Sequence, residues 1–154
     1  WQIDSPYEDA SMEKASCGLY PYLFVTNDDP TVYLSLGMTY FGNKKLDMKS
    51  VRVETDKNYY DFTCDDQFDG GYDNDLKAWF DYELFDMDDE TSWLNEWLAA
   101  KSVTATFTGR DGSTKTYTLT KDNLQAIRDV LNVYDTLLGS DVSTARVVLR
   151  SLVK

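Results

Sequence analysis

The sequence contains no histidine, only two cysteines and three prolines, and no apolar run long enough to cross a membrane. The absence of histidine excludes Ser-His-Asp and Cys-His catalysis and the usual zinc sites. The motifs G-x-S-x-G, G-x-G-x-x-G and the P-loop are also missing. The sequence therefore predicts a protein that is not an enzyme and that does not insert into a membrane.

Basic residues are scarce: 15 Lys and Arg against 27 Asp and Glu give a formal net charge of −12. A chain this acidic repels nucleic acid and anionic membrane surfaces, so neither is an expected partner. Hydrophobic residues make up 42% of the chain and aromatic residues 14%, which argues against disorder. The 154 residues are enough for one domain with a substantial core.

The hydrophobic pattern predicts an N-terminal arm at residues 1–17 and a single domain of the α+β class at residues 18–154. Runs with period two, or rich in β-branched and aromatic residues, predict strands at 19–26, 31–42, 49–55, 59–64, 77–85, 102–109 and 114–120. Gly37 lies inside the second run and is a candidate bulge. We expect a mainly antiparallel, sandwich-like sheet system with two helices in the C-terminal half.

The period changes to that of a helix in two places. The first helix begins at Asp89 or Thr91, either of which can cap it. Its apolar stripe consists of Trp93, Leu94, Trp97 and Leu98. The second helix follows its predicted cap, Thr120, and ends before Gly139. The tail at 141–154 fits either a helix or a strand.

Cys17 and Cys64 are the two cysteines of the chain. They can form one disulfide, which favours an exported protein, or they can be two free thiols that pack as small hydrophobes. A disulfide requires Cα atoms within about 7 Å of each other, and the sequence does not show that distance. Both alternatives therefore stay open.

The stretch DDQFDGGYDND, residues 65–75, contains five Asp and two Gly. An EF-hand loop beginning at Asp65 fails because its twelfth position is Leu76, which cannot ligate, and because a strand precedes it. A calcium site of another type would use Asp65, Asp69 and Asp73. The competing interpretation is an acidic, solvated turn, since Asp and Gly are favoured in turns. No other cofactor is expected.

Acidic residues are concentrated between Asp61 and Glu90, where twelve acids accompany a single base, Lys77. This concentration predicts a negative face around residues 61–90. Such a face could bind cations or a basic partner, or it could keep the protein soluble.

Asp81 and Glu83 are the candidate catalytic pair. On a strand they share one face, about 6–7 Å apart, which lies within the range of paired glycosidase carboxylates. The same alternation places Phe80, Tyr82 and Leu84 on the other face. Exposed strand faces often carry acids, and catalysis also requires one carboxyl whose pKa is raised by burial. A carboxylate-based glycoside hydrolase is therefore the most distant of the alternatives.

The chain has 11 Tyr and 4 Trp. Several of the tyrosines fall on predicted strands, where aromatic side chains pack well: Tyr33, Tyr40, Tyr59 and Tyr60. Trp93 and Trp97 lie one turn apart on the apolar stripe of the first helix. Core packing is the expected role of these rings, and a sugar- or peptide-binding platform is the lesser alternative.

Two stretches resemble β-rich modules of secreted, lipid-anchored lipoproteins of Gram-positive and gut bacteria. In the first, the residues that carry the resemblance are Tyr40-Phe41-Gly42, Val51-Arg52-Val53 and Tyr60-Asp61-Phe62. The second, residues 97–137, is similar to the closing half of those modules: a short helix, a hairpin with Gly at its turn, and a helix after a Leu-Thr pair. The resemblance implies export, a membrane tether through a removed N-terminal lipobox, and no catalytic residues.

The chain opens at Trp1 rather than Met, so we expect a processed piece from which any targeting segment has been removed. Cys17 does not fit a lipobox cysteine, because Glu13 and Lys14 precede it where an apolar run is needed. We expect a non-enzymatic binding or interaction module, extracellular or at the surface of a bacterial cell, with an unknown protein or carbohydrate partner. A calcium-stabilised module that uses residues 65–75 is the alternative.

Overall fold

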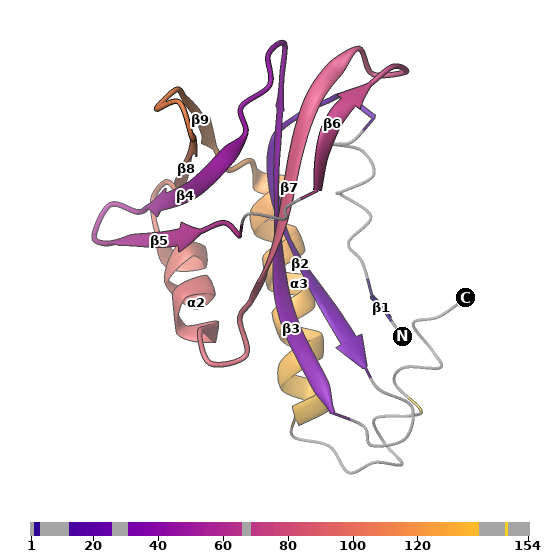
Figure 1. Cartoon of the computed structure of the whole chain (residues 1–154). Coiled ribbons are helices and arrows are strands. Elements are labelled where there is room, and N and C mark those ends of the chain that lie inside the picture. Colours follow the sequence, from indigo (N-terminus) through magenta and orange to yellow (C-terminus); the bar gives the residue numbers. More distant parts are fainter. Residues whose placement is uncertain (1, 4–12, 26–30, 66–68, 139–146, 148–154) are drawn as a thin grey trace.

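The computed structural model describes residues 2–3, 13–25, 31–65, 69–138 and 147. Its strands are β1 (Gln2–Ile3), β2 (Gly18–Val25), β3 (Val32–Gly42), β4 (Met48–Glu54), β5 (Tyr59–Thr63), β6 (Asp69–Asp73), β7 (Ala78–Asp86), β8 (Thr104–Gly109) and β9 (Thr114–Thr118). Its helices are α2 (Thr91–Ala99) and α3 (Lys121–Leu138). The predicted α+β class is confirmed, with antiparallel sheets and both helices in the C-terminal half (Figure 1).

The strands form two antiparallel sheets. Sheet A has the order β1-β2-β3-β7-β6, and sheet B has the order β5-β4-β8-β9. Figure 1 shows α3 running behind β2 and β3, and α2 beside sheet B. The turn that joins β6 to β7 lies at the end of sheet A away from α2 (Figure 1). Within the predicted N-terminal arm, Gln2 and Ile3 pair with Phe24 and Leu23 of β2.

The alternation predicted for β4 is confirmed and shows how sheet B contributes to the core. Val51 and Val53 are fully buried, whereas Arg52 and Glu54 are exposed. The neighbouring strand β8 buries alternate residues in the same way, because the apolar side chains of adjacent strands lie on the same face of the sheet and are buried together. The opposite face of β8 carries threonines.

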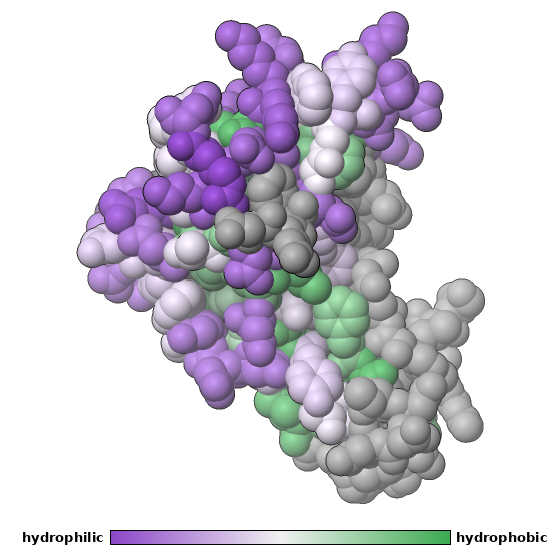
Figure 2. Space-filling model, viewed as in Figure 1, coloured by the Kyte–Doolittle hydropathy of each residue, from purple (hydrophilic) through white to green (hydrophobic). Residues whose placement is uncertain are grey.

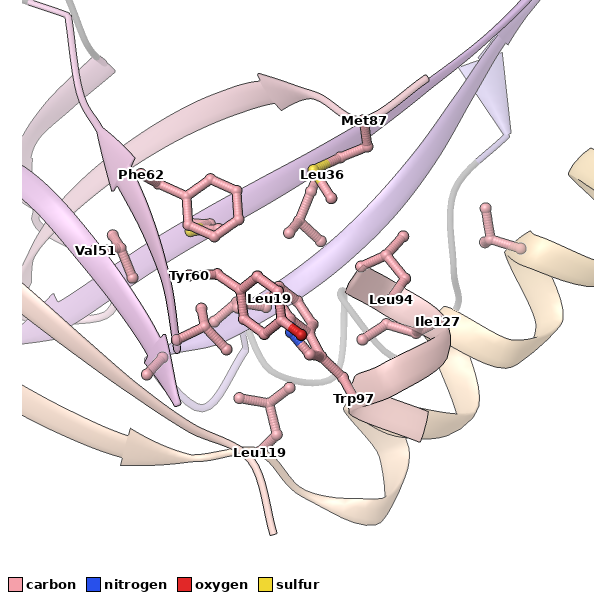
Figure 3. Close-up of a cluster of buried hydrophobic side chains, with 14 of the residues drawn as sticks. Leu19, Leu36, Val51, Tyr60, Phe62, Met87, Leu94, Trp97, Leu119 and Ile127 are labelled. Atoms are coloured by element: carbon pink, nitrogen blue, oxygen red, sulfur yellow. The ribbon is translucent and has the colours of Figure 1, made fainter. Parts of the chain in front are cut away.

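Aromatic rings join sheet B to α2. Trp97 is fully buried, and its ring lies 5.8 Å from that of Tyr60 and 6.3 Å from that of Phe62, centroid to centroid. The side chains of Leu19 and Ile127 belong to the same cluster (Figure 3). The helical stripe predicted from the sequence therefore faces the core, as expected from its spacing.

Gly37 does not form the predicted bulge, because β3 pairs without interruption with β2 and β7 through this position. A Cβ atom at Gly37 would lie 2.5 Å from a ring carbon of Tyr22 and 3.0 Å from one of Tyr82. The glycine is therefore needed for space: the two tyrosine rings from the neighbouring strands lie over the bare backbone of the central strand.

The N-terminus of α3 is capped by Thr120, as predicted. The backbone N–H of Asn123 donates to Oγ1 of Thr120 (3.2 Å), and Oδ1 of Asn123 accepts from the backbone N–H of Thr120 (3.0 Å). The backbone N–H of each residue thus donates to the side chain of the other, as in a capping box. Further along α3, the hydroxyl of Tyr134 donates to the carboxylate of Asp88 (3.3 Å) and attaches the helix to the end of β7.

The predicted cap of α2 is wrong. Neither Asp89 nor Thr91 occupies the N-cap position; Glu90 does, and it makes no side-chain capping hydrogen bond. The helix is held instead by burial of Leu94 and Trp97, since tertiary packing can replace capping energy in a short helix.

Part of the acidic stretch is a strand rather than the predicted turn. Residues 69–73 form β6 and pair with β7, and a turn follows at residues 74–77. Residues 66–68 of the stretch lie outside the described residues. Asp and Gly are poor strand formers, so the ladder with β7 overrides local propensity. The predicted tail at 141–154 lies outside the described residues except for Val147.

Helices long and apolar enough to span a bilayer are not found in the described part of the chain.

Leu36 and Leu84 provide a matched test of the sheet A core, because they lie on adjacent strands and differ in burial. Leu36 is fully buried, whereas Leu84 is 38% exposed. Leu36→Ala should lower the free energy of unfolding by about 2–5 kcal/mol, since it removes apolar contacts and leaves a cavity. Leu84→Ala should cost less than about 1 kcal/mol. Urea denaturation measures both, and equal losses would contradict this assignment of the faces.

Candidate functional site

Cys17 and Cys64 are free thiols, and both are buried. The Cys17 thiol donates to the backbone oxygen of Phe41 (3.4 Å) and accepts from its backbone N–H (3.3 Å). Burial, followed by the nearby Glu83 carboxylate, raises the pKa of Cys64 to about 12. Of the two sequence alternatives, the structure shows the second: small buried groups in the thiol form, which are poor nucleophiles.

Asp81 does not lie on an exposed face of β7. Its side chain is 1% exposed, and its Oδ2 accepts a hydrogen bond from the backbone N–H of Met48 (3.0 Å) at the start of β4. Its Oδ1 has no hydrogen-bond partner within the described part of the chain. Phe85 follows on the same face and packs against Phe62 of sheet B, with ring centroids 5.1 Å apart. This face of β7 therefore looks towards sheet B.

Glu83 is half-buried next to Asp81, and its Oε2 accepts from the backbone N–H of Asp65 (3.3 Å). The expected exposed carboxylate pair is thus not formed. Asp81 is closed off from a polymeric substrate, and Glu83 is engaged in holding the chain after β5. A glycosidase needs both carboxyl groups to flank the bond that is cleaved.

Burial is the largest influence on Asp81 and raises the pKa of its carboxyl group, while the backbone amide of Met48 lowers it by less. The side chains of Asp47 and Lys45 act in opposite directions and more weakly. A folded-state pKa above the unfolded value means that the folded protein holds this proton more tightly. The stability that Asp81 contributes is therefore complete below about pH 3.9 and is lost as the pH rises through the folded pKa.

Asp81→Asn isolates this effect, because asparagine has the same shape and does not titrate. The free energy of unfolding of the wild type minus that of the variant should decrease as the pH rises from about 4 to 8. Urea denaturation across this range measures the difference. A difference that stays constant would show that Asp81 has the same pKa in the folded and unfolded states.

Two of the three predicted calcium ligands, Asp69 and Asp73, are held apart. Asp69 and Asp73 lie at the two ends of β6, four residues apart, which separates their backbones by about 13 Å. Calcium binds oxygens at about 2.3–2.6 Å, so a single ion cannot use both side chains on this strand. Oδ1 of Asp73 also accepts hydrogen bonds from the backbone N–H groups of Asp75 and Leu76, both at 2.8 Å.

Asp65 lies just beyond β5, where its backbone N–H donates to Glu83 of β7. Its backbone oxygen accepts from the guanidinium of Arg110 (3.4 Å), and the residue is exposed. Searching the described ranges finds no cluster of three or more Cys, Asp or Glu side chains arranged to hold a metal ion. The proposed ligand set of Asp65, Asp69 and Asp73 is therefore not supported by the geometry.

Calcium should accordingly leave the thermal unfolding midpoint unchanged relative to EDTA. An ion that binds only the folded state raises the midpoint by mass action, and the spacing of Asp69 and Asp73 provides no shared site. Differential scanning fluorimetry in millimolar calcium and in EDTA makes the comparison. A rise of several degrees with calcium would restore the alternative of a calcium-stabilised module.

The acids between residues 61 and 90 do not form one negative face. Asp61 lies on the outer face of sheet B in a bidentate pair with Arg52, with N–O distances of 2.7 and 2.8 Å. Asp81 is buried. Asp75 lies in the turn that precedes β7, whereas Asp86 is the last residue of that strand, which is about 26 Å long. The charge concentration in the sequence is thus divided among separate surfaces.

The β6–β7 hairpin combines one of these acidic groups with an exposed tyrosine that packs against a half-buried tryptophan. Tyr72 is 47% exposed, and its ring contacts that of Trp79 edge-on, with centroids 5.4 Å apart. Asp69 and Asp75 on the same hairpin are exposed, and Asp73 is half-buried. We call these five residues the hairpin surface. Residues at this end of the molecule are mainly hydrophilic in Figure 2.

The interpretation of residues 65–75 as an acidic turn does not predict Tyr72 as a strand residue, and so does not predict its contact with Trp79. The available signal was the pairing of an aromatic on each side of the short turn at 74–77, which is typical of a hairpin. Within the described ranges two other tyrosines are exposed: Tyr33 on sheet A (44%) and Tyr59 on sheet B (62%), where the Arg52 guanidinium lies 4.5 Å from the ring centroid.

No family model matches the chain, and neither the curated proteins nor the solved structures contain a match to it. The resemblance to bacterial lipoprotein modules is not tested by these comparisons and stays a prediction.

Proposed function

We propose that this domain is a non-enzymatic binding or interaction module that acts outside a bacterial cell or at its surface, on a protein or carbohydrate partner. The observation that carries the proposal is the hairpin surface. Aromatic side chains with one polar end are favoured at binding surfaces because they provide large contact area and a hydrogen-bonding group. Tyr72 presents such a group next to Trp79, at the edge of a rigid sheet.

The placement of the reactive groups supports the non-enzymatic part of this proposal. Both thiols are buried, with the pKa of each raised by burial, and the Asp81 carboxyl faces sheet B. Glu83 is engaged by the backbone of Asp65. The two thiols, Asp81 and Glu83 are thus each used in packing or in a hydrogen bond to the backbone. Asp81 and Glu83 therefore do not form the accessible carboxylate pair that the hydrolase alternative requires.

The location follows from the resemblance and from the charge. Export and a lipid tether at the N-terminus are what the lipoprotein resemblance implies. The net charge of −12 disfavours nucleic acid and anionic membranes as partners and favours a partner with basic groups. Free buried thiols are compatible with an exported protein whose stability comes from its core.

Glycan and peptide arrays probed with the folded domain test the proposal, together with a reducing-sugar assay on polysaccharides. We expect binding without sugar release, and weaker binding by Tyr72→Ala, which removes an exposed ring from the hairpin surface. Tyr33→Ala is the matched control, because Tyr33 is similarly exposed on another part of sheet A. Sugar release that Asp81→Asn or Glu83→Gln abolishes would overturn the proposal. A domain that binds neither the glycan array nor the peptide array would overturn it too.

A further inference from the structure

The outer side of β6 is an open sheet edge. β6 ends sheet A and pairs only with β7 among the described strands. Gly70 is exposed and Gly71 is half-buried. A glycine has no side chain, so its exposure is exposure of the backbone. The backbone in the middle of β6 is therefore accessible to solvent, and no described strand pairs with its outer side.

β6 lacks the features that usually prevent a sheet edge from pairing. Its five residues include no lysine and no proline, and its register with β7 runs without a bulge. Among the edge strands of sheet B, β9 carries Lys115, whereas β5 also lacks lysine and proline but has alternate residues buried in the core. No hydrogen bond joins residues 69–72 to a described residue outside the ladder with β7.

The side chains of β6 show which partners its edge disfavours. Asp69 and Asp73 project from one face, because they are an even number of residues apart, and Tyr72 projects from the other. If a second copy paired along the whole of β6 in antiparallel fashion, Asp69 would lie opposite the second copy's Asp73. Parallel pairing would likewise place each aspartate next to its counterpart. Like charges directly across a ladder are destabilising, so self-pairing is opposed.

We propose that the edge of β6 binds an extended, basic segment of another protein, which adds to sheet A as a sixth strand. This inference rests on the proposed function and names the partner class and the mode of binding. Backbone hydrogen bonds to the open edge give affinity, and side chains on alternate positions give specificity. Lys or Arg at two positions four residues apart would lie opposite Asp69 and Asp73 on one face. An apolar residue on the other face would lie against Tyr72.

Charge and backbone shape are complementary in this arrangement. Asp69, Asp73 and Asp75 make the edge negative, and Lys77 is the single base in the hairpin. The glycines at the centre of β6 leave space for the partner strand to approach. A basic strand therefore gains cross-strand ion pairs where a second copy of the domain meets repulsion.

Fluorescence polarisation with synthetic peptides tests the inference. The probe is a labelled peptide of Thr and Val that carries Lys at two positions four residues apart, and the control peptide carries Glu at the same positions. Two further probes have N-methyl groups on alternate residues, so that each lacks the N–H donors along one edge of the peptide. We expect the Lys peptide to bind, more weakly at high salt, and the Glu peptide not to bind. Methylation of one edge should abolish binding, whereas methylation of the other edge should not.

Asp69→Asn should weaken binding of the Lys peptide by about two- to fivefold, the loss of one cross-strand ion pair. Asp89→Asn is the matched control, since it removes the same charge from an exposed position beyond the far end of β7 and should leave binding unchanged. Any of three results would overturn the inference: the two substitutions weaken binding equally, methylation of the two peptide edges has equal effects, or the Lys peptide does not bind. Binding to an array glycan without binding of the Lys peptide overturns this inference alone, whereas sugar release overturns the proposed function whatever the peptides do.

Discussion

The packing of Phe62 against three other rings is the contact on which the rest of this fold depends. Phe62 belongs to sheet B, and its ring lies within 5.1 to 6.3 Å of the rings of Phe85 from sheet A and of Trp93 and Trp97 from α2. One side chain thus joins both sheets and a helix. Aromatic rings in such tilted and edge-on arrangements bury large apolar area and add a geometric preference. The orientation of β7, and with it the β6–β7 hairpin, follows from this contact.

The orientation of β7 determines which side chains are available for chemistry. With Phe85 turned towards sheet B, Asp81 must turn the same way, because residues four apart on a strand share a face. The carboxyl group is then buried beside Met48 and becomes a group whose protonation is coupled to folding. The same alternation leaves Leu84 on the outer face. Packing of one aromatic residue therefore removes a candidate catalytic acid from solvent.

The hairpin surface is a consequence of sheet A extending past the region covered by the rest of the domain. Among the described strands β6 pairs with β7 alone, and Tyr72 on it is exposed. Acidic side chains on that edge oppose pairing with a second copy and favour a basic partner, which gives one physical role to the residues that first suggested a calcium loop.

The sequence by itself determined most of the secondary structure. Period two predicted β4 and the β8–β9 hairpin, and period 3.6 with Thr120 as cap predicted α3, because these signals depend only on local geometry. It could not determine that residues 69–73 are a strand, since Asp and Gly favour turns and the ladder is provided by β7.

Alternation showed that β7 has two faces, but only the tertiary structure decided which one is buried. The face with Phe80, Tyr82 and Leu84 has the stronger apolar pattern. Asp81 on the opposite face is nevertheless buried more deeply than these three residues, since sheet B covers that face. The grouping of acids was equally a tertiary matter. Residues adjacent in sequence lie on different surfaces once a strand of about 26 Å separates them. The local pattern of apolar residues shows whether a segment is a helix or a strand and which residues share a face. Which face is buried depends on contacts between segments far apart in the chain.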